Sequence, residues 1–260
     1  ADRTRISCLE MSEPETPSEK QETPAEKPTP KVVPVVRVME TFDEMPVAPV
    51  VRLGIERLGF AAPTPIQQRI VGPMIADRDV IGLAPTGTGK TLAYGIPLAH
   101  RLIENPPPLA RREKKRKGGD AGSKYVDPRR RLRGLVVVPT RELAQQVSTE
   151  LRWLFADLED TIVASVTGGT PIFQDKNTLR NEPRVLIGTP GRLVDHLTNE
   201  NLDLGNAREL VLDEADQMLD MGFREDLETI LNATPGERRT HMVSATFPPG
   251  IERLAERYQR

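Results

Sequence analysis

Short apolar runs alternate with amphipathic stretches along most of this chain, and that alternation limits its fold more than any other feature. In 141–155, for example, Leu143, Val147, Leu151 and Leu154 recur at the spacing of one helix face. The intervening runs are rich in Val, Ile and Leu, as strands buried on both faces should be. These candidate strands are 79–84, 134–138, 161–167, 184–189, 209–212 and 240–244. Such alternation predicts an α/β fold, with a mostly parallel sheet and helices on both faces.

The segment 84–91, APTGTGKT, follows the first candidate strand and precedes a helical pattern. This is the context of a phosphate-binding loop (P-loop). Gly87 and Gly89 let backbone N–H groups approach an anion, and the helix start adds a positive dipole end. Lys90 would bind the β- and γ-phosphates, and Thr91 would supply a hydroxyl for Mg²⁺. Alanine stands where the general pattern has its first glycine, so a plain glycine-rich turn is the alternative.

The candidate strand 209–212 ends in the acidic tetrad DEAD at 213–216. A carboxylate at the end of a strand can hold Mg²⁺ through water, which is the role we expect for Asp213. Its neighbour Glu214 can orient and deprotonate an attacking water. Alone, such a pair is often a solvated turn. Together with the P-loop, the two segments supply both halves of one metal–nucleotide site, with Lys90, Asp213 and Glu214 as its catalytic residues.

Two segments are too polar to join a core. The stretch 10–30 consists mainly of Glu, Pro, Thr, Ser and Lys, so burial cannot offset the entropy of ordering it. We expect residues 1–38 to form a disordered or poorly ordered tail. The second segment, 105–133, opens with three prolines and carries clusters of Lys and Arg. It is either an arm that attracts nucleic-acid phosphates or a solvated insertion loop. The remainder, 39–260, is expected to form one domain.

Composition excludes several classes of protein. No apolar run approaches the roughly 18 residues of a membrane span, so we expect no membrane partner. The single cysteine, Cys8, and three scattered histidines argue against a disulfide framework and against Cys- or His-based metal sites. A reducing, cytoplasmic location is the expectation, with the nucleus left open. The net charge of −2 does not argue against nucleic acid, because local clustering matters more than the sum.

The acidic tetrad spells the name of the DEAD-box ATP-dependent RNA helicases, and the chain resembles that family from about residue 42 onward. The other motifs of the family follow in order. They are GFAAPTPIQ at 59–67 (the Q motif), APTGTGKT at 84–91, PTRELA at 139–144, GG at 168–169, TPGR at 189–192 and SAT at 244–246. The resemblance implies the first, N-terminal RecA-like P-loop domain of such a helicase. The second RecA-like domain is expected to be absent from this chain.

For the nucleotide, the resemblance implies ATP with Mg²⁺. Phe42, seventeen residues before Gly59, matches the aromatic that stacks on adenine. Gln67 carries an amide donor and acceptor that can match adenine's edge. Without the family context, Phe42 could instead be a residue of the core and Gln67 a surface residue in a proline-rich turn. The nucleotide-binding residues implied are Phe42, Gln67, Thr86, Gly87, Thr88, Gly89, Lys90 and Thr91, with Thr91 and Asp213 at the metal.

For RNA, the resemblance implies contacts with the sugar-phosphate backbone, and such contacts do not depend on the base sequence. Thr189 and Pro190 are typical of a helix start, and a helix start suits a phosphate. A capped helix facing solvent is the alternative. The RNA-binding residues implied are Pro139, Thr140, Arg141, Gly168, Gly169, Thr189, Pro190, Gly191 and Arg192.

By the same resemblance, Asp216, Ser244 and Thr246 couple nucleotide state to closure of two domains. The function implied is ATP binding and hydrolysis coupled to RNA binding and local duplex unwinding, with this fragment alone nearly inactive. A non-catalytic ATP-gated RNA clamp or assembly scaffold remains an alternative, because it would use the same binding residues. A DNA-directed helicase is disfavoured by the Q motif and Asp216. The sequence does not specify the biological RNA, the pathway, the organism or the protein partners.

Overall fold

The computed structural model describes residues 4–7, 38–104 and 132–260. Within them lies one parallel sheet of seven strands, in the order β1-β2-β7-β6-β3-β5-β4. The strands are β1 (Thr4–Ser7), β2 (Val80–Leu83), β3 (Gly134–Val137), β4 (Val163–Val166), β5 (Val185–Gly188), β6 (Glu209–Asp213) and β7 (Arg239–Ser244). All six candidate strands are confirmed, and the α/β fold with a parallel sheet is confirmed with them.

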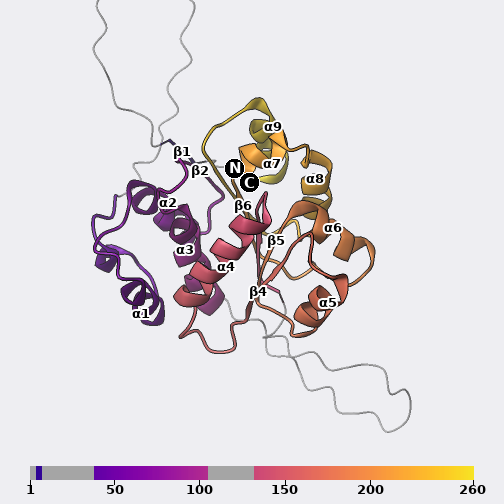
Figure 1. Cartoon of the computed structure of the whole chain (residues 1–260). Coiled ribbons are helices and arrows are strands. Elements are labelled where there is room, and N and C mark those ends of the chain that lie inside the picture. The colour runs from indigo at the N-terminus through magenta and orange to yellow at the C-terminus, as the bar shows by residue number, and fades with distance from the viewer. Residues whose placement is uncertain (1–3, 8–37, 105–131) are drawn as a thin grey trace, which may run out of the picture.

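Helices cover both faces of the sheet (Figure 1). One layer contains α1 (Pro49–Leu58), α2 (Pro65–Ile75), α3 (Lys90–Glu104) and α4 (Arg141–Leu154), with the short 3₁₀ helix η1 (Phe42–Glu44) beside α1. The other contains α5 (Ile172–Arg180), α6 (Pro190–Thr198), α7 (Ala215–Asp220), α8 (Arg224–Ala233) and α9 (Pro249–Tyr258). From β2 to β7, at least one helix lies between each strand and the next along the chain, as βαβ units require, and α9 follows β7.

The strands divide their side chains between two apolar cores. In β3, Val136 packs in the core under α1–α4, whereas Leu135 and Val137 pack in the core under α6–α9. Successive side chains of a strand point to opposite faces, so a strand buried on both faces must be apolar throughout. This is why most of the candidate strands read as runs rich in Val, Ile and Leu rather than as alternating patterns. The exception is β7, which buries Thr240, His241 and Ser244.

The motif segments converge because the sheet is parallel. Each of the strands β2 to β7 is followed, at its carboxyl end, by one of the motif segments. The carboxyl ends of parallel strands share one edge, which is where open α/β sheets bind ligands. Segments separated by most of the chain's length therefore meet along one edge of the sheet.

Two expected boundaries differ from the structure. Thr4–Ser7, inside the predicted disordered tail, forms β1 and pairs in parallel with β2. The open edge of β2 offers unpaired backbone groups that a short segment can satisfy. Arg133, the last residue of the predicted basic loop, has its backbone N–H bonded to the Arg184 carbonyl and its carbonyl bonded to Arg208. The predicted tail and the predicted basic loop therefore each include residues that bond to the sheet. The rest of these two segments, residues 1–3, 8–37 and 105–131, lies outside the described residues.

Candidate functional site

The P-loop joins β2 to α3 and is shaped by two glycines in the left-handed region. Gly87 has φ of 82° and Gly89 has φ of 84°. A Cβ at Gly89 would lie 2.6 Å from Gln67 Nε2, so a side chain at this position would collide as well as strain the backbone. The hydroxyl of Thr88 donates to the Pro85 carbonyl at 2.7 Å and closes the turn.

At the centre of the loop, Lys90 is 6% exposed and pairs with the acidic tetrad. Its Nζ lies 2.8 Å from Glu214 Oε1 and donates to the Ala84 carbonyl at 3.1 Å. The hydroxyl of Thr86 donates to the same Glu214 oxygen at 3.0 Å. Glu214 itself has a left-handed backbone, with φ of 50° and ψ of 51°. Strained backbone of this kind is concentrated at functional sites, where surrounding contacts hold it in place.

Asp213, at the end of β6, is almost completely buried. Its Oδ2 accepts a hydrogen bond from the Tyr94 hydroxyl at 2.9 Å, and its Oδ1 accepts one from the Glu214 N–H at 3.0 Å. Burial raises the pKa of Asp213 to about 6, against the opposing effects of the Tyr94 hydrogen bond and the Lys90 charge. Burial, reinforced by Asp213, also raises the pKa of Tyr94 well above its usual value. Tyr94 was not among the expected site residues, because an aromatic residue inside a helix is typical of core packing.

The donor groups at this site fit Mg²⁺. Thr91 lies one helical turn before Tyr94, on the same face of α3, and Tyr94 contacts Asp213. Together, Thr91 and Asp213 offer one hydroxyl and one carboxylate. Among the described residues, no group of three or more His, Cys, Asp or Glu side chains could hold a metal ion. A hard cation here would therefore take the rest of its ligands from phosphates and water, as Mg²⁺ does.

Gln67, predicted to recognise adenine, is 2% exposed and bonded at both ends of its amide. Its Oε1 accepts from the Thr64 N–H at 2.9 Å, and its Nε2 donates to the Gly89 carbonyl at 3.0 Å. The first contact is half of a capping box at the start of α2, which the Thr-x-x-Gln spacing could have predicted. Gln67 therefore ties α2 to the P-loop. Phe42, its predicted companion at adenine, begins η1 and is half-buried against the core. Base recognition by either side chain stays a prediction.

The SAT segment bridges the P-loop and the acidic tetrad, because β7 lies between β2 and β6. The Ser244 carbonyl accepts from the Ala84 N–H at 3.0 Å, and its Oγ accepts from the Asp216 N–H at 3.2 Å. Thr246 donates to Asp216 Oδ2 through its hydroxyl at 2.7 Å and its N–H at 2.9 Å. Burial raises the pKa of Asp216, but the hydrogen bonds from Thr246 and Ser244 outweigh burial and lower it. These contacts fit the coupling role expected of the three residues.

The segments predicted to bind RNA meet at the ends of β3, β5 and β4, which are neighbours in the sheet. Thr140 caps α4 by accepting from the Leu143 N–H at 3.2 Å. Thr189 is the N-cap residue of α6, as predicted, but its hydroxyl makes no capping bond and accepts from the Gly168 N–H at 3.4 Å, which joins two of the segments. Pro139 and Pro190 are buried, Gly191 is half-buried, and Arg141 is exposed.

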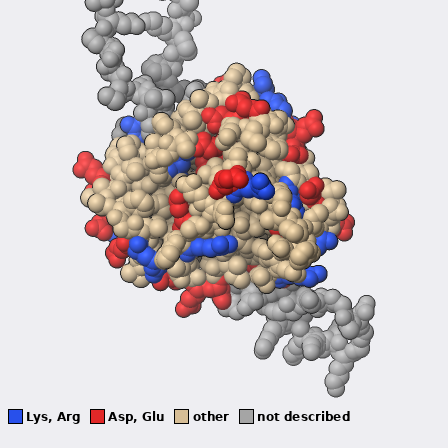
Figure 2. All heavy atoms as spheres, in the orientation of Figure 1, with Lys and Arg blue, Asp and Glu red and all other residues tan. Residues whose placement is uncertain are grey.

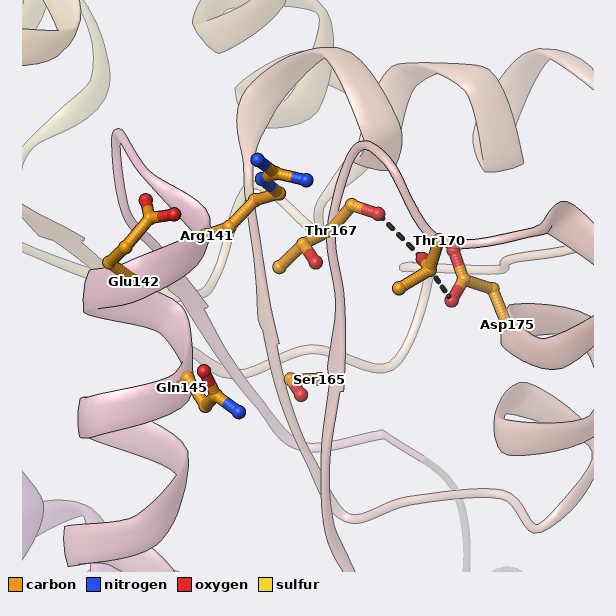
Figure 3. Close-up of a pocket in the computed structure, with 7 residues that line it drawn as sticks. All are labelled: Arg141, Glu142, Gln145, Ser165, Thr167, Thr170 and Asp175. Atoms are coloured by element: carbon orange, nitrogen blue, oxygen red, sulfur yellow. Dashed lines mark hydrogen bonds between the residues drawn. The ribbon is translucent and has the colours of Figure 1, made fainter.

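A hollow of about 440 Å³ opens beside this surface. Figure 3 shows Arg141, Glu142 and Gln145 of α4 on one side of it and Thr170 and Asp175 on the other. Ser165 and Thr167 complete its lining. Basic and acidic side chains are interspersed over the face in Figure 2, with no single broad basic patch there.

Arg192, another of the predicted RNA-binding residues, is buried and paired within the protein, and its contact with RNA stays a prediction. It is 8% exposed, and its Nη1 lies 3.0 Å from Asp175 Oδ2. Its Nη2 donates to the Thr170 carbonyl at 2.6 Å. Asp175 also contacts His196 and, like His196, was not among the expected site residues. No local pattern could have found this cluster, because it is assembled by the packing of α5 against α6.

The described part of the chain contains no helix that is both long and apolar enough to cross a membrane.

Comparisons with known proteins agree with the resemblance seen in the sequence motifs. A family model described as DEAD/DEAH box helicase matches residues 64–254.

Among curated proteins, the chain is 41% identical over 221 residues to the DEAD-box ATP-dependent RNA helicase CshA of Geobacillus kaustophilus, a match that covers 85% of this chain and 42% of that protein. It is 39% identical over 220 residues to the ATP-dependent RNA helicase CshA of Listeria monocytogenes, with 85% and 38% covered. The chain thus spans about two-fifths of the length of these relatives.

Among solved structures, a DEAD box protein from the hyperthermophile Methanococcus jannaschii matches with a TM-score of 0.72 and 32% identity. That match covers 85% of this chain and 54% of the other. The family model spans most of the chain, including the P-loop, the acidic tetrad and the SAT segment. The chain therefore belongs to the DEAD/DEAH box helicase family.

Proposed function

We propose that this chain is the ATP-binding RecA-like domain of an ATP-dependent RNA helicase, which couples ATP binding and hydrolysis to RNA binding and local duplex unwinding. The observation that carries the proposal is the convergence of Lys90, Thr86 and Glu214 within hydrogen-bonding distance, beside the buried Asp213. These side chains come from two separate strand ends. They bring together a cation for phosphates, a carboxylate for water and a carboxylate for a metal ion.

In the proposed mechanism, backbone N–H groups of residues 86–90 and the start of α3 receive the phosphates of ATP. Lys90 holds the β- and γ-phosphates, so it must exchange Glu214 for them. Glu214, once released, orients and deprotonates the attacking water. Thr91 and Asp213 would hold Mg²⁺, which offsets charge on the phosphates when it is bound.

RNA would lie along the neighbouring ends of β3, β5 and β4. Arg141 contributes exposed charge, and the segments 168–169 and 189–191 contribute backbone groups close to the surface. These are contacts to phosphate and sugar, so we expect binding independent of base sequence. The contacts of Ser244 with both Ala84 and Asp216 support a path by which nucleotide state reaches this edge.

Two measurements test the proposal. Calorimetry with ADP and Mg²⁺ on this chain should detect binding that Lys90→Ala removes and that Lys176→Ala, at an exposed lysine on α5, leaves intact. Phosphate release by the longer protein that contains this domain should rise on addition of RNA. A longer protein that binds ATP and RNA without turnover would instead support the ATP-gated clamp.

A further inference from the structure

A buried ionic cluster lies directly beneath the loop that carries the paired glycines. Asp175, on α5, is 4% exposed, and its Oδ2 lies 3.0 Å from Arg192 Nη1 and 3.2 Å from His196 Nε2. Both partners come from α6. The cluster therefore joins α5 to α6 at the point where the chain crosses from β4 into α5.

The same cluster fixes Thr170 from two sides. Asp175 Oδ1 accepts from the Thr170 hydroxyl at 3.1 Å, and Arg192 Nη2 donates to the Thr170 carbonyl at 2.6 Å. The hydroxyl also lies 2.8 Å from the Thr167 carbonyl, and Figure 3 shows both of its contacts. Thr170 is exposed, yet its polar groups are directed inward. The loop's shape therefore depends on the buried side chains of Asp175 and Arg192.

Through this loop the cluster acts on Arg141. Gly169, next to Thr170, has φ of 85°, and a Cβ on it would lie 2.2 Å from Arg141 Nη1. The Arg141 guanidinium therefore rests on the Gly169 backbone. A shift of the loop would remove that support and change where the exposed cation of this surface lies.

We propose that Asp175, Arg192 and His196 are positioning residues that hold the 168–170 loop, and with it Arg141, in the shape that receives the RNA backbone. This inference rests on the proposed RNA-binding function. Arg192 is assigned to positioning because its guanidinium is buried and committed to Asp175 and Thr170. It also neutralises a carboxylate that would otherwise repel a phosphate bound nearby.

The first test is Asp175→Asn, which keeps the side chain's shape and removes its charge. Hydrogen exchange of residues 167–171 should be faster than in the wild-type chain. At about 0.15 M salt, which screens the unpaired Arg192, affinity for a labelled single-stranded RNA should fall about tenfold, roughly the worth of one charged contact from an Arg141 that is no longer held in place. Affinity for ADP should not change. Asp175→Glu should recover part of the RNA affinity, and Asp195→Asn, at an exposed carboxylate on α6, should match the wild type.

Asp175→Asn could unfold the domain, so Thr170→Val provides a second test at an exposed position. It removes the hydroxyl that contacts both Asp175 and the Thr167 carbonyl. Thr178→Val on α5 is its matched control. Faster exchange in the loop together with weaker RNA binding supports the inference. Unchanged exchange in both variants, or faster exchange with unchanged RNA affinity, would overturn it. A wild-type chain that binds no RNA would count against the proposed function, whereas the exchange result would still decide whether the cluster holds the loop.

Discussion

Lys90 and Glu214 form a buried ion pair, with Nζ 2.8 Å from Oε1. The pair joins the residue predicted to bind phosphate to the residue predicted to activate water. A nucleotide must therefore compete with Glu214 for Lys90. The Thr86 hydroxyl, which also donates to Glu214, gives the carboxylate a remaining partner when the lysine leaves.

Lys90→Ala should remove detectable nucleotide binding. Hydrogen bonds from charged groups contribute about 1.5–3 kcal/mol each, so the loss of this cation should weaken ADP binding by roughly 10–150-fold or more. The fold should persist, because Glu214 keeps its bond from Thr86. Calorimetry measures the affinity, and circular dichroism checks the fold. ADP affinity equal to that of Lys176→Ala would show that Lys90 does not bind phosphate.

Glu214→Gln should separate binding from hydrolysis. The substitution removes the charge that competes for Lys90, so ADP affinity of this chain should equal or exceed that of the wild type. In the longer protein, ATP hydrolysis should be lost, because an amide cannot accept the proton of the attacking water. Single-turnover phosphate release measures this step, with Glu252→Gln on α9 as the control. Equal turnover in Glu214→Gln and wild type would eliminate the water-activating role.

Gln67 should affect both nucleotide affinity and base choice. Wild type should prefer ADP to GDP, because an amide that exchanges its bonds to Thr64 and Gly89 for bonds to a base is matched by the edge of adenine and not by the reversed edge of guanine. Gln67→Ala should weaken both nucleotides, since it also removes the bond to the Gly89 carbonyl. Titrations of both variants with ADP and GDP distinguish the two effects. Comparable ADP and GDP affinities in the wild type would show that Gln67 only supports the P-loop.

Asp77 should contribute stability that depends on pH. The hydrogen bond from Arg239 and the charge of Arg101 hold its pKa down to about 2, against burial, from an ordinary value of 3.8. A lowered pKa stabilises the fold above the ordinary value, and that contribution is lost as pH falls from about 4 to about 2. Asp77→Asn should therefore reduce the free energy of unfolding at pH 7.

The loss should be below about 1 kcal/mol, because Asp77 is half-exposed and its ion pairs are screened by solvent. The loss should shrink toward pH 2. Denaturant titrations at pH 7 and pH 3 measure it, with Asp43→Asn at an exposed carboxylate for comparison. An effect of Asp77→Asn that does not diminish between these pH values would contradict the assignment.

Strands β2 to β7 could be predicted because burial on both faces leaves a short, mainly apolar run, which is rich in Val, Ile and Leu in all of them but β7. The P-loop and the acidic tetrad could be predicted because their chemistry requires fixed residues at fixed spacing. Strand β1 could not, since four residues carry little pattern and their pairing depends on the open edge of β2. Tyr94 and Asp175 could not either, because their roles arise only when α3 meets β6 and α5 meets α6. For the same reason the burial of Arg192 against Asp175 could not be predicted.

The final prediction concerns the activity of this chain by itself. Phosphoryl transfer needs charge stabilisation at the γ-phosphate, and an arginine finger is worth roughly 10³–10⁵ in rate. Family resemblance places those arginines on a second RecA-like domain, and this chain spans only about two-fifths of its relatives. By the same resemblance, we expect the RNA contacts to be divided between the two domains. ATP and RNA can strengthen each other's binding only if both favour the same one of two states of the protein. The chain should therefore bind adenine nucleotide, show negligible RNA-stimulated ATP hydrolysis and unwind nothing. Steady-state phosphate release with and without RNA, beside a strand-displacement assay, measures both activities. RNA-stimulated turnover at the rate of a complete helicase would mean that the catalytic cations lie within these 260 residues.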